Sequence, residues 1–141
     1  MLSTLPGFQW PVRVYYEDTD SGGVVYYANY LRFMERARTE WMRELGFEQD
    51  VLIREEGVIF AVRSAKVDYL RPALFNDQLT VVTELTHRGR ASLTFFHSII
   101  RQQEPAQPCC TGEVKVACIN AESLRPQPIP DSLFKEIADV S

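Results

Sequence analysis

Three carboxylates within four residues are the first candidate for chemistry in this chain. They are Glu17, Asp18 and Asp20, and two glycines and an aromatic run follow them in VYYEDTDSGGVVYYANY (residues 14–30). A carboxylate can act as a general base, or as a nucleophile that forms a covalent intermediate. The first N–H groups of a helix have no intrahelical partner, so they can polarise a carbonyl and hold a developing oxyanion. Together the two features suit attack on an activated acyl group such as a thioester.

The helix that this chemistry needs is predicted directly after the segment. Gly46 ends its pattern, and its start is expected near Tyr27 or Ala28. Glu35 falls on its polar side among arginines, where a surface role is expected. The apolar stripe has the 3.6-residue period of an α-helix and consists of Tyr30, Phe33, Met34, Ala37, Trp41 and Leu45.

Other chemistries fit the segment less well. An EF-hand count from Asp18 lacks a side-chain ligand at its fifth position and places Asn29 where a bidentate Glu is needed. His87 and His97 are the only histidines and lack helical metal spacing, so no metal site is expected. Neither a phosphate-binding glycine motif nor a serine in GxSxG is present. A solvated connection that only favours the helix dipole remains the structural interpretation.

The rest of the chain is predicted to be mainly extended. A tight reversal is expected at HRGR (residues 87–90), and Asp131 is a candidate cap for a short helix over residues 132–138. The order of strand, long helix, four strands and terminal helix predicts an α+β fold, with an antiparallel sheet wrapped around one long helix. The expected strands are residues 12–16, 58–70, 79–86, 91–101 and 112–119.

Composition narrows the class of protein. The 141 residues suit one domain, and the formal net charge of −4 disfavours nucleic acid as a partner. The N-terminal MLSTLPGFQW lacks the pattern of a signal peptide, and no apolar run is long enough to span a membrane. Cys109, Cys110 and Cys118 fit neither a disulfide framework nor a zinc site. A cytoplasmic location is therefore expected.

Two stretches resemble the 4-hydroxybenzoyl-CoA thioesterase family, and most closely its branch associated with the Tol–Pal envelope system. They are YYEDTDSGGVVYYANYLRFMERARTEWMRELGF (residues 15–47) and VDYLRPALFNDQLTVVTEL (residues 67–85). The resemblance implies a single hotdog domain over residues 1–141, with its core at about 10–125 and a C-terminal extension over 126–141. It also implies hydrolysis of acyl-CoA without a cofactor, by homodimers or homotetramers with active sites between subunits.

The resemblance further implies roles for single residues. The family's catalytic aspartate corresponds to Asp20, which would act either as nucleophile or as general base. The helix-start N–H that polarises the thioester carbonyl corresponds to Tyr27. Gly23, Tyr26 and Asn29 are candidate substrate-binding residues, since a glycine lets the backbone approach a ligand closely.

Residues farther along the chain complete the expected site. Arg88 and Arg90 flank the HRGR reversal, near the position where relatives bind the CoA phosphates, so they are candidate phosphate ligands. His97 alternates with apolar residues and is expected in the core or at an interface. Tol–Pal-type relatives commonly carry histidine where this chain has Tyr27, whereas tyrosine resembles the aryl-CoA branch. The main-chain donor survives that exchange, and the preference for aliphatic or aryl acyl groups stays open.

Two other classes of function are open. Hotdog dehydratases act on acyl-carrier-protein thioesters with a catalytic histidine, and the absence of histidine from the motif disfavours them. A non-catalytic or weakly catalytic protein that binds acyl-carrier protein or Tol–Pal partners is the alternative hypothesis.

Overall fold

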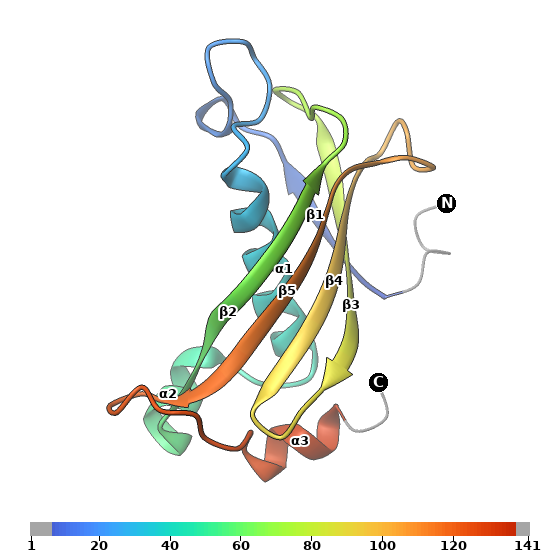
Figure 1. Cartoon of the computed structure of the whole chain (residues 1–141). Coiled ribbons are helices and arrows are strands. Elements are labelled where there is room, and N and C mark those ends of the chain that lie inside the picture. The colour runs from blue at the N-terminus through green and yellow to red at the C-terminus, as the bar shows by residue number, and fades with distance from the viewer. Residues whose placement is uncertain (1–6, 138–141) are drawn as a thin grey trace.

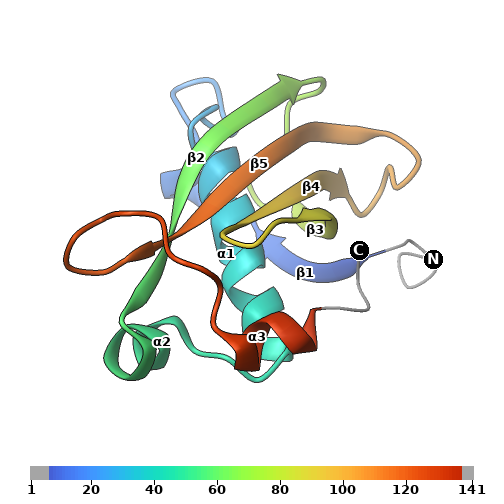
Figure 2. The same ribbon diagram turned by 60° about the horizontal axis from the view of Figure 1, so that its bottom comes forward.

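The fold is one five-stranded antiparallel sheet that curves around a long helix, as predicted. The computed structural model describes residues 7–137. In the sheet order β1-β3-β4-β5-β2 every neighbouring pair is antiparallel. Figures 1 and 2 show helix α1 (Asn29–Glu44) inside the curve of the sheet. The strands are β1 (Phe8–Arg13), β2 (Val58–Tyr69), β3 (Gln78–Arg88), β4 (Ser92–Arg101) and β5 (Pro108–Asn120).

The apolar stripe of α1 forms the centre of the core, because it faces the inward residues of the strands. Gly112 of β5 lets the helix approach the sheet closely: a Cβ at this position would lie 2.7 Å from Met34 Cε. Gly46 ends the helix with a φ of +96°, as the sequence predicted. The buried residues of α1 are Asn29, Tyr30, Phe33, Met34, Ala37, Trp41 and Met42.

Three elements differ from the sequence prediction. The first strand is Phe8–Arg13, four residues earlier at its start than expected, where it pairs with β3. A second helix, α2 (Gln49–Glu56), follows α1 and was not predicted. The last helix, α3 (Asp131–Glu136), starts one residue early, and its N-cap is Pro130. Asp131 makes no capping hydrogen bond with its side chain, so that prediction was wrong.

The connection between β2 and β3 (residues 70–77) is held from within by Asp77. The carboxylate accepts the Leu74 N–H at 2.8 Å and forms an ion pair with Arg101, also at 2.8 Å. Burial raises the pKa of Asp77, but the Leu74 N–H, Arg101 and Gln103 together outweigh burial and hold the pKa below its ordinary value. This rigid connection lies at the top of Figure 1 beside the acidic segment, and we name that end of the sheet the upper end.

Candidate active site

The acidic segment folds into a tight hairpin ahead of α1. The Asp20 N–H donates to Val24 O at 3.0 Å, and the Gly23 N–H donates back to Asp20 O at 3.1 Å. Gly23 has a φ of +77°, a conformation that favours glycine. The Phe75 N–H donates to Gly23 O at 3.1 Å, which joins the hairpin to the β2–β3 connection. The hairpin is therefore fixed at both its ends rather than being a free loop.

The two aspartates of the hairpin have different surroundings. Asp18 accepts the Tyr15 N–H at 2.8 Å with Oδ2, and its main-chain oxygen accepts the Tyr26 N–H at 2.9 Å. Asp20 is exposed, and its Oδ1 accepts the Gly22 N–H at 2.9 Å. Among the described residues, nothing donates a hydrogen bond to Asp20 Oδ2. Asp18 is thus part of the turn itself, whereas Asp20 keeps an oxygen free for a substrate or a water molecule.

Free N–H donors lie at the start of α1. The helix begins at Asn29 with Ala28 as its N-cap, and no side chain caps it. Across residues 7–137, neither the Tyr27 N–H nor the Ala28 N–H has a protein acceptor. The helix dipole adds partial positive charge at this point. The two N–H groups and Asp20 belong to one short segment, which is the arrangement that the sequence chemistry requires.

The side chain of Tyr27 lies in a cluster of tyrosines. Its ring centroid is 4.8 Å from that of Tyr26 and 5.9 Å from that of Tyr69, which is the last residue of β2. A hydrogen bond with the Tyr27 hydroxyl raises the pKa of Tyr26. Burial raises the pKa of Tyr30, whose hydroxyl accepts the Ala73 N–H at 3.1 Å. The cluster places an exposed aromatic wall next to the free N–H groups.

Asn29 and Gly23 hold the site together. The Asn29 amide donates to Asp18 O at 3.0 Å, and the residue is only 6% exposed. It fixes the helix start to the hairpin and faces the interior. Gly23 is half-buried and gives the hairpin its reversal. Both residues support the main chain of the site from its interior side. Tyr26, in contrast, is 46% exposed and can contact a ligand.

Arg88 and Arg90 lie at the opposite end of the sheet from Asp20. The turn between β3 and β4 is at the bottom of Figure 1, near α2 and α3, and we name this the lower end. Arg88 stacks on Phe134 of α3, with Cζ 4.1 Å from the ring centroid. The side chain of Arg90 is exposed. A single chain therefore does not bring either arginine to the acidic hairpin.

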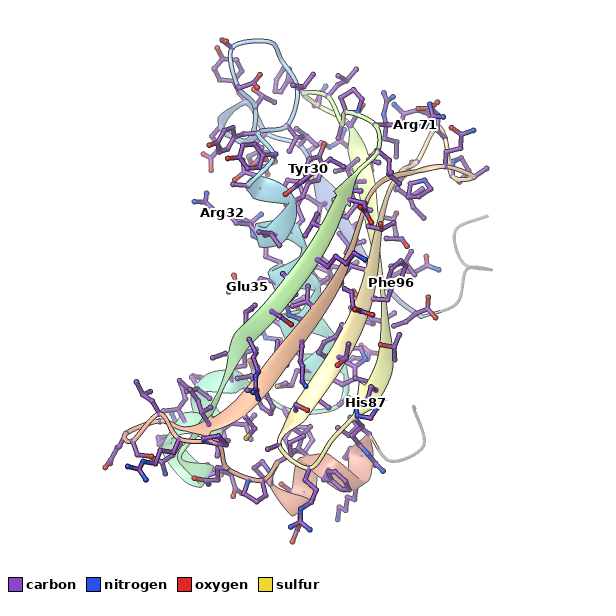
Figure 3. All side chains as sticks on the ribbon, in the orientation of Figure 1. Tyr30, Arg32, Glu35, Arg71, His87 and Phe96 are labelled. Atoms are coloured by element: carbon purple, nitrogen blue, oxygen red, sulfur yellow. The ribbon has the colours of Figure 1, made fainter. Side chains whose placement is uncertain are left out.

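Two upper-end residues escaped the sequence analysis. Tyr69 contacts Tyr27 and Tyr30. It is the last residue of a strand that ends shortly before a proline, and this position could have indicated a residue near the site. Arg71 is an exposed arginine at the upper end, as Figure 3 shows. It directly precedes the same proline, where the chain turns at the surface.

Other side chains with reactive groups are enclosed. Cys109, Cys110 and Cys118 are free and buried, and burial raises the pKa of all three thiols, to about 12 for Cys110 and about 11 for Cys118. His97 is fully buried, which confirms its predicted place in the core. The described residues contain no group of three or more His, Cys, Asp or Glu side chains that could hold a metal ion. None of the helices within residues 7–137 is long and apolar enough to cross a membrane.

Comparison with known proteins establishes the family. The model of the "Thioesterase-like superfamily" matches residues 14–137. This chain belongs to that superfamily. It is 43% identical over 129 residues to the "Acyl-CoA thioester hydrolase YbgC" of Escherichia coli O6:H1, and the aligned part covers 92% of this chain and 94% of the relative. It is 40% identical over 131 residues to the "Acyl-CoA thioesterase YbgC" of Helicobacter pylori strain 26695, with 89% and 95% covered.

Solved structures of the thioesterase-like superfamily agree with this fold. A probable thioesterase from Bartonella henselae superposes with a TM-score of 0.81 at 34% identity, over 87% of this chain and 98% of its own. The resemblance inferred from residues 15–47 and 67–85 is thereby confirmed, and so is the hotdog arrangement of sheet and helix.

Proposed function

We propose that this protein hydrolyses acyl-CoA thioesters to a free acid and CoA. The observation that carries the proposal concerns one short segment: among the described residues, one carboxylate oxygen of Asp20 and the N–H groups of Tyr27 and Ala28 have no hydrogen-bond partner. Relatives that are 40% and 43% identical over most of the chain are named for the same reaction.

In this mechanism the thioester carbonyl oxygen accepts the Tyr27 N–H, assisted by the positive end of the α1 dipole. Asp20 then either removes a proton from a water molecule that attacks the carbonyl carbon, or attacks that carbon itself. Collapse of the tetrahedral intermediate breaks the carbon–sulfur bond and releases CoA as the thiol once its sulfur has taken up a proton. If Asp20 attacks, water hydrolyses the resulting anhydride in a second step.

We propose that the working form is a homodimer joined through β2, or a homotetramer built from two such dimers. This strand lies at one edge of the sheet and is twelve residues long, and most of residues 62–69 are exposed. A long exposed edge strand offers a row of unpaired N–H and C=O groups to a second strand. Because β2 runs from the lower end to the upper end, antiparallel pairing of two β2 strands would place the lower end of one chain beside the upper end of its partner.

In that assembly Arg88 and Arg90 would lie close enough to bind the substrate, which they do not do in a single chain. Each pair would lie near the acidic hairpin of the other subunit, where the CoA phosphates are expected. Arg90 is the more accessible of the two, because Arg88 is engaged by Phe134. Arg90→Gln is expected to raise KM for acyl-CoA while leaving KM unchanged for an acyl-N-acetylcysteamine, which has no phosphate. An equal change for both substrates would contradict this role.

The test of the whole proposal is the release of free thiol from short, long and aryl acyl-CoAs by wild type and Asp20→Asn. Wild type should hydrolyse at least one member of the panel, and the variant should lose about 10²–10⁴-fold in kcat. A wild type that is inert on the whole panel, or a fully active variant, would refute the mechanism. The binding role with acyl-carrier protein or Tol–Pal partners, which rests on resemblance, would then be tested by pull-down.

The proposed location is the cytoplasm. All three cysteines are free thiols in the structure, which suits a reducing compartment. Fractionation of the cells that produce the protein, with detection by antibody, tests this directly.

A further inference from the structure

A short antiparallel ladder joins the acidic hairpin to the β2–β3 connection. The Val25 N–H donates to Ala73 O at 2.8 Å, and a bridge pairs Val24 with Leu74. Val25 and Ala73 are both buried, so water does not replace the bond between them. The Asp20 N–H donates to Val24 O, across the hairpin. A shift of the connection therefore moves Asp20 as well.

The start of α1 is joined to the same point of the connection by one side chain. Tyr30 lies in the first turn of the helix, and its hydroxyl accepts the Ala73 N–H at 3.1 Å. Figure 3 shows Tyr30 at the upper end, where α1 begins. The N–H groups of Tyr27 and Ala28 are three and two residues earlier in the chain. Ala73 thus bonds to the helix start with its N–H and to the hairpin with its carbonyl oxygen.

The Tyr30 side chain is enclosed and does not face a substrate. It is only 4% exposed, and its ring contacts Phe33 and Tyr69. Burial raises the pKa of Tyr30 above its ordinary value of 10.0, so the phenol stays neutral near pH 7. A buried, neutral hydroxyl that accepts one main-chain N–H holds a position and takes no proton from the reaction.

The connection is a firm support because each of its ends is fixed elsewhere in the sheet. The N–H groups of Leu70 and Arg71 both donate to Cys109 O of β5, at 2.8 Å and 3.0 Å. At the other end Asp77 forms its ion pair with Arg101 of β4. Two groups that are tied to one point of such a support are held at a fixed distance from each other.

We propose that Tyr30 is a positioning residue, whose hydroxyl sets the distance between the Asp20 carboxylate and the N–H groups at the start of α1. The inference rests on the proposed function for the reaction that this distance serves. A base and an oxyanion donor act on one carbon only when both are held in place, and a misplacement of about 1 Å can cost about 10²-fold in rate. Asn29 makes a second link, through the main-chain oxygen of Asp18. Loss of the Tyr30 hydroxyl should therefore loosen the arrangement without abolishing it.

The test removes the hydroxyl and keeps the ring, with Tyr30→Phe. For thiol release from the best acyl-CoA, kcat should fall about 10-fold while KM stays within about 2-fold of wild type. In the Asp20→Asn background the same change should lower kcat by less than about 2-fold, because the position of a base matters only when the base is present. An equal fold-loss in the two backgrounds, or an unchanged kcat in Tyr30→Phe, overturns the proposal.

Thr83→Val is the matched control, because it also removes a buried hydroxyl that accepts an N–H. Thr83 Oγ1 lies 3.0 Å from Nδ1 of the fully buried His97, whose Nε2 lies 3.0 Å from Arg38 Nη1. Arginine only donates, so Nε2 accepts and the Nδ1–H donates to Thr83. Both variants leave one buried N–H without its acceptor and should lose similar stability in urea. Only Tyr30→Phe should lower kcat; an equal fall in Thr83→Val would make stability the cause and overturn the proposal.

Amide hydrogen exchange tests the position without turnover. In Tyr30→Phe the amides of Ala73, Val25 and Phe75 should exchange about 3- to 10-fold faster than in wild type, whereas the amides of β4 should keep their rates. Wild-type exchange at all three amides in the folded variant overturns the proposal. A wild type that is inert on every acyl-CoA refutes the hydrolytic function in thiol release, and the exchange rates still decide whether Tyr30 holds the hairpin to the helix start.

Discussion

The two ends of the sheet use similar residue types in opposite ways. At the upper end Asp20 is exposed, and within residues 7–137 one of its carboxylate oxygens accepts no hydrogen bond and the Tyr27 N–H has no acceptor. At the lower end, Arg88 is covered by Phe134, and α2 and α3 close the sheet (Figure 2). At the lower end Arg88 is engaged by Phe134 of its own chain, while at the upper end a fixed turn holds Asp20 and leaves it available. Availability, more than residue type, marks the candidate active site.

The same contrast separates the two aspartates of the hairpin. Asp18 and Asp20 are two residues apart and chemically identical, yet Asp18 accepts the Tyr15 N–H and supports the start of α1 through its main-chain oxygen. A carboxylate whose oxygens satisfy its own turn supports structure, whereas one that a fixed turn presents to solvent can act on a substrate.

The strongest test of this contrast is the pair Asp20→Asn and Asp18→Asn. Asp20→Asn should lower kcat by about 10²–10⁴-fold, because the amide cannot accept a proton as a base or act as the nucleophile. Asp18→Asn should stay within about one order of magnitude of wild type, because an amide oxygen can still accept the Tyr15 N–H. Steady-state thiol release measures both. Equal losses in the two variants would show that the hairpin acts through its charge as a whole.

The enclosed part of the molecule can be tested through pH. The folded-state pKa of His97, about 3, lies below its ordinary value of 6.5, so the unfolded chain binds more protons between these values. The stabilising contribution of the neutral ring is complete above pH 6.5 and is lost as pH falls toward 3. At pH 5 wild type should have lost about 2 kcal/mol relative to His97→Gln, whose amide keeps both hydrogen bonds but does not titrate. Urea denaturation of both proteins at pH 7.5 and pH 5 measures the difference. Parallel pH profiles would place His97 in contact with water.

Aromatic contacts offer a third comparison between the ends. Phe134→Ala should cost about 2 kcal/mol of unfolding free energy, because it removes both partly buried area and the contact with Arg88. Phe75 at the upper end is 51% exposed and only meets the edge of Tyr16. Phe75→Ala should therefore cost about 1 kcal/mol or less. Chemical denaturation compares the two. A larger loss for Phe75 would mean that the upper end is as tightly packed as the lower.

The smallest expected effect concerns the Tyr27 side chain. Tyr27→Phe keeps the main-chain N–H and most of the contact with Tyr69, so kcat should remain near the wild-type value. Loss of the hydroxyl also removes the hydrogen bond that raises the pKa of Tyr26, which ultraviolet titration of the tyrosines can follow. A large fall in kcat would assign the hydroxyl a part in proton transfer.

Sequence reasoning found the elements that depend on a regular pattern. The stripe from Tyr30 to Leu45 predicted α1 because five of its six residues are buried against the sheet, and period-two runs predicted the later strands. Helix α2 was missed because only Leu52 of its eight residues is buried, which leaves no stripe to detect. The motif selected the acidic segment, and the resemblance selected Asp20 within it.

What the sequence could not predict depends on three-dimensional contacts. The sequence alone does not distinguish an exposed arginine at a turn from Arg88, which is covered by Phe134 about 45 residues later in the chain. Arg38 was likewise unremarkable on the polar side of α1, since its bond to His97 joins residues 59 positions apart. Long side chains place their charge away from their own backbone, so helical position alone does not say where that charge lies.

The three buried cysteines give the molecule a built-in reporter of its own opening. Thiol reagents react with thiolates, and burial combined with a raised pKa keeps Cys110 and Cys118 almost free of thiolate in the folded state. A colorimetric thiol reagent will therefore register released CoA with little background from the intact enzyme. The slow labelling that remains, followed over hours without substrate, will measure how often β5 separates from its neighbours.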